Sequence, residues 1–241
     1  MPRDNRRDAH AAGVPADAAL GLRVHSGWAA LVALSGPLAT PAVLMRRRIE
    51  LVDRDSPGGK QPFHAARGLP LDAAQELVGR ALDGATRMAS GALAAAAGEL
   101  RRQGAGSIAC GILQSAARPL PPLPAVLASH ALVHTAEGEL FRDALARAAA
   151  GEGVAALGAL RILRILRIFR IKERELLDRC TARLGVGAAG LERHLAELGR
   201  TLGPPWRQDE KLATLAAWLA LASRGKADRE DRAEVVGQSP S

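Results

Sequence analysis

Large aromatic side chains and cysteines are both scarce in this sequence. Aromatic residues make up 2% of the 241 residues, tyrosine is absent, and Cys110 and Cys180 stand far apart with no CxxC pair. The sequence therefore indicates neither a disulfide framework nor a cysteine-ligated metal, and it favours a reduced, cytoplasmic protein. Because 48% of the residues are hydrophobic, a large core can still form from small and branched aliphatic side chains. The alanine, arginine, glycine and leucine bias is typical of a bacterial gene rich in G and C.

Signals for secretion or membrane insertion are also lacking. The first 20 residues, MPRDNRRDAHAAGVPADAAL, contain no apolar segment of the kind found in signal peptides. Residues 24–45 carry no formal charge and precede Arg46, Arg47 and Arg48, as a spanning segment with a positive flank would. Turn-forming residues at 35–37 and 40–41 interrupt this run, so we predict two strands joined by a tight turn and no transmembrane segment.

The charge of the chain is concentrated in one repeat. The net charge is +8 and the isoelectric point is about 10.8, which suggests a polyanionic partner. Residues 158–172, GALRILRILRIFRIK, hold five basic residues and no acid, so the rest of the chain carries only +3. Arginine at every third position suits neither an amphipathic helix nor a buried strand. We interpret the repeat as a short tandem duplication in which residues 167–171 form a strand.

The order of the expected elements defines a fold class. Three strands at 20–24, 28–34 and 42–52 precede a loop at 60–70 and a helix at 71–103, which Gly84, Gly91 and Gly98 are expected to bend or break. A buried strand at 107–113 and a helix at 125–150 follow, and the remaining helices are expected at 173–184, 190–202 and 208–223. We expect a disordered arm at 1–17, one α/β domain at 18–223 whose residues 172–223 are helical, and a disordered tail at 224–241.

Three hairpin-linked strands followed by alternating helices and strands resemble the ribonuclease-H-like fold, which Holliday-junction resolvases share and actin- and hexokinase-type ATPases contain in duplicate. The segment GLRVHSGWAALVAL adds a local likeness, since it is similar to the first hairpin of some bacterial members of that superfamily. The resemblance implies a mixed sheet in which a three-stranded antiparallel meander precedes the parallel strands, with a helical C-terminal part.

The resemblance also implies catalytic acids that this chain does not supply. A nuclease of this superfamily would need carboxylates on its first and fourth strands to hold two metal ions. Arg23 and His25 stand where the first acid belongs, and the fourth strand, SIACGIL, contains no acid. An ATPase would need an acidic phosphate loop, which the turn at 25–27 lacks, and DSPGGKQ is no Walker A motif. Glu137, Glu139, Asp209 and Glu210 remain, and we expect them to be ordinary solvent-facing helix residues.

One cluster of metal-ligating residue types does stand out. His130, His134 and Glu137 lie at i, i+4 and i+7, which places them on one face of the expected helix. Two imidazoles and a carboxylate can bind zinc or another divalent metal, and His64 could be a fourth group if folding brings it near. The alternative is that these side chains form hydrogen bonds between the helix and the sheet, since no HExxH motif is present.

The leading functional hypothesis is a bacterial, cytoplasmic, non-catalytic binding or accessory protein on a ribonuclease-H-like fold, with nucleic acid or another protein as partner. Seven basic side chains are the candidate phosphate contacts: Arg46, Arg47, Arg48, Arg161, Arg164, Arg167 and Arg170. One alternative is a metal-dependent hydrolase that uses His130, His134 and Glu137. A second alternative, which we disfavour, is a protein that binds a membrane surface through residues 161–172.

Overall fold

The computed structural model describes residues 16–53, 55–56, 58–115, 119–151 and 166–236. Five strands form one mixed sheet with the order β3-β2-β1-β4-β5. They are β1 (Ala16–His25), β2 (Trp28–Ser35), β3 (Ala42–Glu50), β4 (Ala105–Gln114) and β5 (Leu166–Lys172). The first three are antiparallel to one another, while β4 pairs with β1 and β5 with β4 in parallel. This order and these directions are those of a ribonuclease-H-like α/β fold, and they confirm the predicted fold class.

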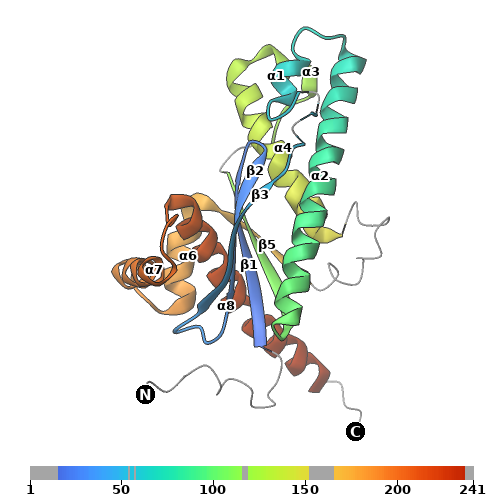
Figure 1. Ribbon diagram of the computed structural model, residues 1–241. Helices are drawn as coiled ribbons and strands as arrows, with labels where there is room; N and C mark the ends of the chain where they lie inside the picture. The colour runs from blue at the N-terminus through green and yellow to red at the C-terminus, as the bar shows by residue number, and fades with distance from the viewer. Residues whose placement is uncertain (1–15, 54, 57, 116–118, 152–165, 237–241) are drawn as a thin grey trace.

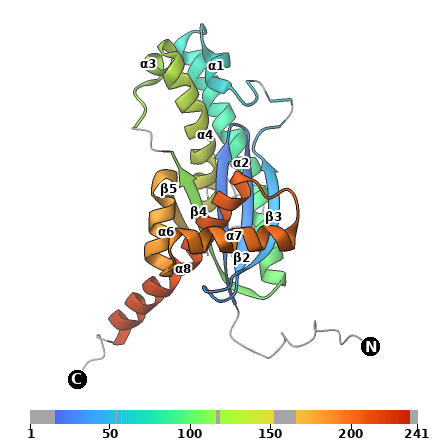
Figure 2. The same cartoon turned by 90° about the vertical axis from the view of Figure 1, so that its left-hand side faces the viewer.

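Helices cover both faces of the sheet (Figures 1 and 2). The helical elements are α1 (Pro62–Ala66), α2 (Leu71–Arg102), α3 (Leu123–Ala128), α4 (His130–Ala150), the 3-10 turn η1 (Glu173–Glu175), α6 (Leu176–Leu184), α7 (Ala188–Leu202) and α8 (Gln208–Val236). Helices α2 and α4 pack on one face, whereas α6, α7 and α8 lie on the other (Figure 1). The elements α1, α3 and the start of α4 gather at one end of the molecule, at the top of both views.

The sheet carries a separate apolar core on each face because successive residues of a strand point to opposite sides. Leu20, Leu22 and Leu31 face α2 and α4, where Leu93 and Phe141 are fully buried with them. On the opposite face, Val32, Leu34 and Leu113 pack against α8, whose Trp218 is 2% exposed and donates from Nε1 to the carbonyl oxygen of Leu38 at 3.0 Å.

Helix α8 approaches the sheet unusually closely. Gly21 of β1 and Gly111 of β4 are paired neighbours in the sheet, and the α8 backbone at Ala213, Ala216 and Ala217 passes directly over them. An alanine Cβ at position 21 would lie 1.9 Å from the carbonyl oxygen of Ala213. Glycine in both strands and alanine in the helix are therefore what allow α8 to lie flat on the sheet.

Three element predictions were wrong. Helix α2 is continuous across Gly84, Gly91 and Gly98, because packing of its alanine- and leucine-rich face outweighs the low helix propensity of glycine. Residues 62–66, expected as loop, form the short helix α1, which begins at Pro62. Helix α8 continues to Val236 and does not end at residue 223, since eight of the thirteen residues 224–236 are alanine, glutamate, lysine or arginine, which favour helix.

The Arg-Ile repeat is described only in its second half. Strand β5 contains the predicted strand at 167–171 and forms the edge of the sheet beside β4. The Arg170 side chain is 56% exposed, and its Nη1 lies 3.9 Å from Oδ1 of Asp143 on α4. Arg161 and Arg164, both candidate phosphate contacts, lie outside the described residues, as do residues 161–165 of the segment that the membrane-surface alternative would use.

Candidate functional site

Three histidines from two helices converge at the end of the molecule where α1 contacts α4. His64 lies on α1, and His130 and His134 occupy the first two turns of α4, whose N-cap is Ser129. One ring nitrogen from each of the three lies within 4.8 Å of the others. The ring centroid of His64 is 4.8 Å from that of His134 and 5.7 Å from that of His130, while Nε2 of His130 and Nε2 of His134 are 3.0 Å apart. His64 thus reaches the two histidines that the sequence placed on one helix face.

Glu137 supports this cluster from behind and does not join it. Its side chain is only 3% exposed, and Oε1 accepts hydrogen bonds from the backbone N–H of His64 at 3.0 Å and from His64 Nδ1 at 3.2 Å. Burial raises the pKa of the Glu137 carboxyl above its usual value, although the contacts with His64 work in the opposite direction. The sequence analysis grouped Glu137 with the candidate metal ligands, whereas in the structure its carboxylate accepts hydrogen bonds from His64.

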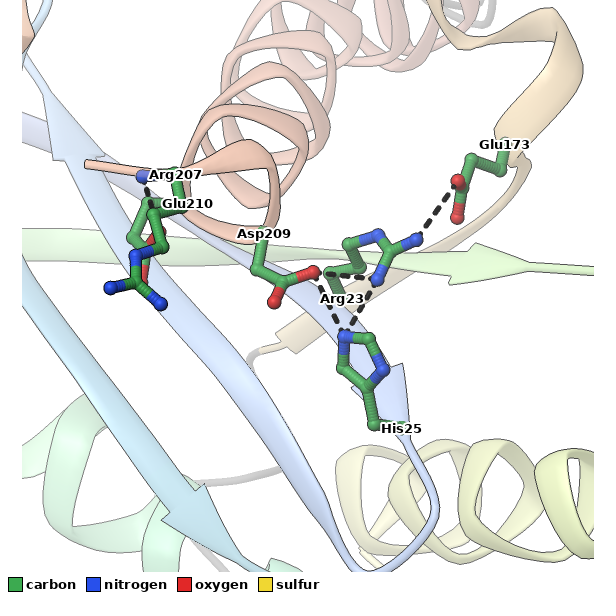
Figure 3. Close-up of polar contacts among 6 residues, drawn as sticks. All are labelled: Arg23, His25, Glu173, Arg207, Asp209 and Glu210. Carbon is green, nitrogen blue, oxygen red and sulfur yellow. Dashed lines mark hydrogen bonds and ion pairs between the residues drawn. The ribbon is translucent and has the colours of Figure 1, made fainter. Parts of the chain in front are cut away.

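A second polar cluster lies on the α8 side of the sheet, at the end of β1 (Figure 3). Arg23 Nη1 donates to Asp209 Oδ1 at 2.6 Å, and Arg23 Nη2 donates to Glu173 Oε1 at 3.3 Å. Nε2 of His25 lies 2.6 Å from Arg23 Nη1 and 2.9 Å from Asp209 Oδ1. The Arg23, Asp209 and His25 side chains are 21%, 26% and 33% exposed, so this cluster is partly shielded from water.

This cluster does not fit the two divalent ions that nucleases of this fold use. The acids present, Glu173 and Asp209, are both bonded to the Arg23 guanidinium, and the sequence of β4 contains no acid. A guanidinium at this position already compensates the carboxylates and would repel a dication at short range.

The cluster continues across the sheet as a row of basic and aromatic side chains. The His25 ring stacks on the Trp28 ring of β2, with centroids 4.3 Å apart and planes 10° apart, and the Arg48 guanidinium of β3 lies 4.0 Å from the Trp28 centroid. The Arg48 side chain is 51% exposed and also bonds to Glu50. We call Arg23, His25, Trp28 and Arg48 the basic–aromatic row.

The other two arginines of the β3 triplet have structural partners. Arg46 Nη1 donates to the carbonyl oxygens of Gly203 at 2.9 Å and Pro205 at 2.5 Å, which fastens the α7–α8 connection to the sheet. Arg47 points to the other face and pairs with Glu99 of α2. Of the three, Arg48 is the most exposed, and its contact with an aromatic ring adds a π surface to its charge.

Asp209 and Glu173 were missed by the sequence reasoning. Asp209 was expected to be an ordinary solvent-facing helix residue, and this was wrong. It lies in the first turn of α8, which packs on the sheet, and its carboxylate accepts a hydrogen bond from Arg23 of β1. The available signal was the apolar run at residues 211–221, KLATLAAWLAL, which favours packing of that helix on the domain. Docking fixes the position of the first helical turn and therefore of its acids.

The comparisons with known proteins give only a distant structural likeness. No protein-family model matches the chain, and a search of curated proteins finds no match. Among solved structures, the chain is similar to Thermus thermophilus RuvC, with 11% identity, a TM-score of 0.43, and coverage of 87% of this chain and 96% of that one. A second similar structure is T. thermophilus RuvC in complex with a Holliday junction substrate, with 10% identity, a TM-score of 0.42 and the same coverage. Within the described residues, no helix combines the length and apolar character needed to cross a membrane.

Proposed function

We propose that this chain is a non-catalytic nucleic-acid-binding protein, in which the basic–aromatic row replaces the acidic catalytic centre of a ribonuclease-H-like domain. The observation that carries the proposal is the position of Arg23, whose guanidinium bonds to Asp209 and Glu173 at the end of β1. A fixed cation at the place where a nuclease needs metal ions removes hydrolysis but leaves a surface suited to phosphate oxygens.

The chemistry of the row supports a nucleic-acid partner. Arginine donates two parallel hydrogen bonds to a phosphate, and half-exposed Arg48 can do so through its two Nη groups, because its contact with Glu50 uses Nε. The stacked rings of His25 and Trp28 lie beside it and can extend the stack to a nucleobase, an interaction that tolerates any sequence. Phosphate contact and base stacking together describe binding without base-specific readout.

A first experiment tests the absence of catalysis. Single-stranded, duplex and branched DNA and RNA are incubated with the full chain in Mg²⁺ or Mn²⁺, and we expect no cleavage. Metal-dependent cleavage that disappears in Asp209→Asn would refute the non-catalytic assignment, because it would show that Asp209 holds a catalytic metal despite Arg23.

A second experiment tests binding and its site. Affinity for single-stranded DNA, measured by fluorescence anisotropy over a range of salt concentrations, should fall with salt, and Arg48→Gln should reduce the slope of log K against log salt by about 1. Arg200→Gln is the matched control, since it removes the same charge from a side chain that is 73% exposed on α7. Salt-independent binding, or equal effects of both variants, would refute the proposal.

Tryptophan fluorescence gives an independent readout of the row. The indole N–H groups of Trp206 and Trp218 are bonded to backbone oxygens of Leu195 and Leu38, whereas Trp28 belongs to the row itself. Quenching on DNA binding should therefore come from Trp28 and be lost in Trp28→Phe. Unchanged quenching in that variant would place the bound base elsewhere.

A further inference from the structure

The three-histidine cluster is built from other elements than the basic–aromatic row and has its own chemistry. His64, His130 and His134 come from α1 and the first turns of α4, on elements that the row does not use. His130 and His134 are exposed and His64 is partly exposed, so the cluster opens to solvent. An ion could therefore enter without rearrangement of the core.

The spacing of the ring nitrogens fits a single metal ion. Metal–imidazole bonds of about 2.0–2.1 Å place neighbouring nitrogens of a tetrahedral site about 3.3 Å apart. Nε2 of His130 and Nε2 of His134 are already 3.0 Å apart, one helical turn from each other. The largest separation in the set is within 4.8 Å, and rotation of the exposed rings on α4 can close it.

Glu137 supplies the outer contact that a metal-binding histidine needs. A carboxylate oxygen accepts from His64 Nδ1 at 3.2 Å, so that nitrogen carries the proton and Nε2 is left with its lone pair for a ligand. The same oxygen accepts from the His64 backbone N–H, which fixes the ring as well as its tautomer. A carboxylate–histidine pair of this kind is the usual support of a metal-bound imidazole.

One oxygen of the buried Glu137 carboxylate, Oε2, makes no hydrogen bond within the described part of the chain. A buried carboxylate without full compensation is costly, and a cation bound to His64 would place positive charge next to it. A cation at the histidines would therefore offset part of the cost of burying Glu137.

We propose that His64, His130 and His134 bind one divalent transition-metal ion, with Glu137 as the positioning residue for His64. An all-imidazole set suits Zn²⁺, Co²⁺, Ni²⁺ or Cu²⁺ and is unsuited to Mg²⁺ or Ca²⁺, which take oxygen ligands. Three protein ligands leave a coordination position open for water or for a group on a partner. This inference does not rest on the proposed nucleic-acid function, because it uses none of the same residues.

The test is titration of the metal-free full chain with Zn²⁺ by calorimetry, and with Co²⁺ by visible absorption. We expect one ion per chain, the intense absorption of a four-coordinate Co²⁺ ion, and no comparable binding of Mg²⁺. His134→Ala should weaken Zn²⁺ binding by more than about 100-fold, and since this side chain is exposed the variant should fold. His194→Gln, on α7, is the matched control and should leave the affinity unchanged.

Glu137→Gln separates positioning from a purely structural role. The variant should bind Zn²⁺ about 10- to 100-fold more weakly and shift the Co²⁺ absorption, because His64 loses its carboxylate partner, while its circular dichroism stays that of the parent. An unshifted Co²⁺ spectrum and unchanged affinity would remove Glu137 from the site. Absence of saturable one-to-one binding, or binding that survives His134→Ala, would overturn the whole proposal.

Discussion

Replacing Gly21 by alanine should destabilise the protein strongly, because the added methyl group would collide with the backbone of α8. The Cβ would lie 1.9 Å from the carbonyl oxygen of Ala213 and 2.5 Å from the backbone nitrogen of Ala217, whereas real Cβ contacts are not shorter than 3.0 Å. Both obstacles are backbone atoms, so no side-chain rotation can relieve them. The helix would have to retreat from the sheet by on the order of 1 Å.

The expected loss of stability depends on the packing contacts that are weakened when α8 moves away from the sheet. Overpacking of a core costs about 1–3 kcal/mol, and a clash of an added Cβ with backbone atoms lies at or above the upper end of this range. Retreat of α8 also loosens the packing of Leu34 and Leu113, which are buried beneath it, and of Trp218 on the helix itself. We therefore expect Gly21→Ala to lower the free energy of unfolding by about 3 kcal/mol or more. Gly111→Ala, whose Cβ would lie 2.4 Å from the Ala216 carbonyl oxygen, should cost less, about 2 kcal/mol.

Urea unfolding followed by circular dichroism measures these differences, with a matched control on α2. Gly79 is exposed within that helix and an added Cβ there would meet no atom within 4 Å. Gly79→Ala should therefore stabilise the protein by about 1 kcal/mol, because glycine is a poor helix former. If Gly21→Ala is neutral, or if Gly79→Ala is the more damaging variant, the close approach of α8 to the sheet is wrong.

Three further predictions concern the thiols and the α7–α8 connection. Burial raises the pKa of Cys110 and of Cys180 to about 12. Both thiols should therefore resist alkylation in the native protein at pH 8 and react fully in denaturant. Rapid modification of the native protein, detected by mass spectrometry, would contradict this. Because the unfolded thiols ionise near pH 9 and the folded ones do not, the free energy of unfolding should be insensitive to these groups below about pH 9 and fall between pH 9 and 12. Arg46→Ala removes the hydrogen bonds to Gly203 and Pro205 and should cost about 1–2 kcal/mol in urea unfolding, whereas Arg200→Ala should cost under about 0.5 kcal/mol.

The fold was predictable because its signals are local. Alternating and continuous apolar runs, broken by Gly27 and by the turn at 35–37, identify the strands, and their order identifies the sheet. The continuity of α2 was not predictable, since whether a glycine breaks a helix depends on the packing of the opposite helical face. The close approach of α8 to Gly21 and Gly111, which we call the glycine seam, was not predictable either. A strand glycine is recognisable as a close-approach site only once its neighbour in the adjacent strand is known.

The candidate sites also contain some features that the sequence predicts and others that depend on the folded structure. The helical spacing of His130 and His134 can be read from the sequence, whereas the approach of His64 depends on α1, a short helix within an expected loop. The role of Glu137 could not be assigned because spacing places it on the face of the histidines but does not reveal its burial. Contacts between distant residues, such as Arg23 with Asp209, require the docked position of α8 and are beyond pattern reading.

The glycine seam and the polar end of the sheet are connected through α8. The seam holds the helix flat on β1 and β4, and the same rigid helix carries Asp209 in its first turn to Arg23. Packing therefore places a carboxylate at the end of β1 whatever residue that strand presents, and the residue on β1 decides what the carboxylate does. An acid there would join it in holding metal ions, whereas Arg23 pairs with it, and under the proposed function the same scaffold then binds nucleic acid without cleaving it. It follows that charge changes at position 23 should alter ligand affinity while the fold survives, and that loosening the seam should disturb both.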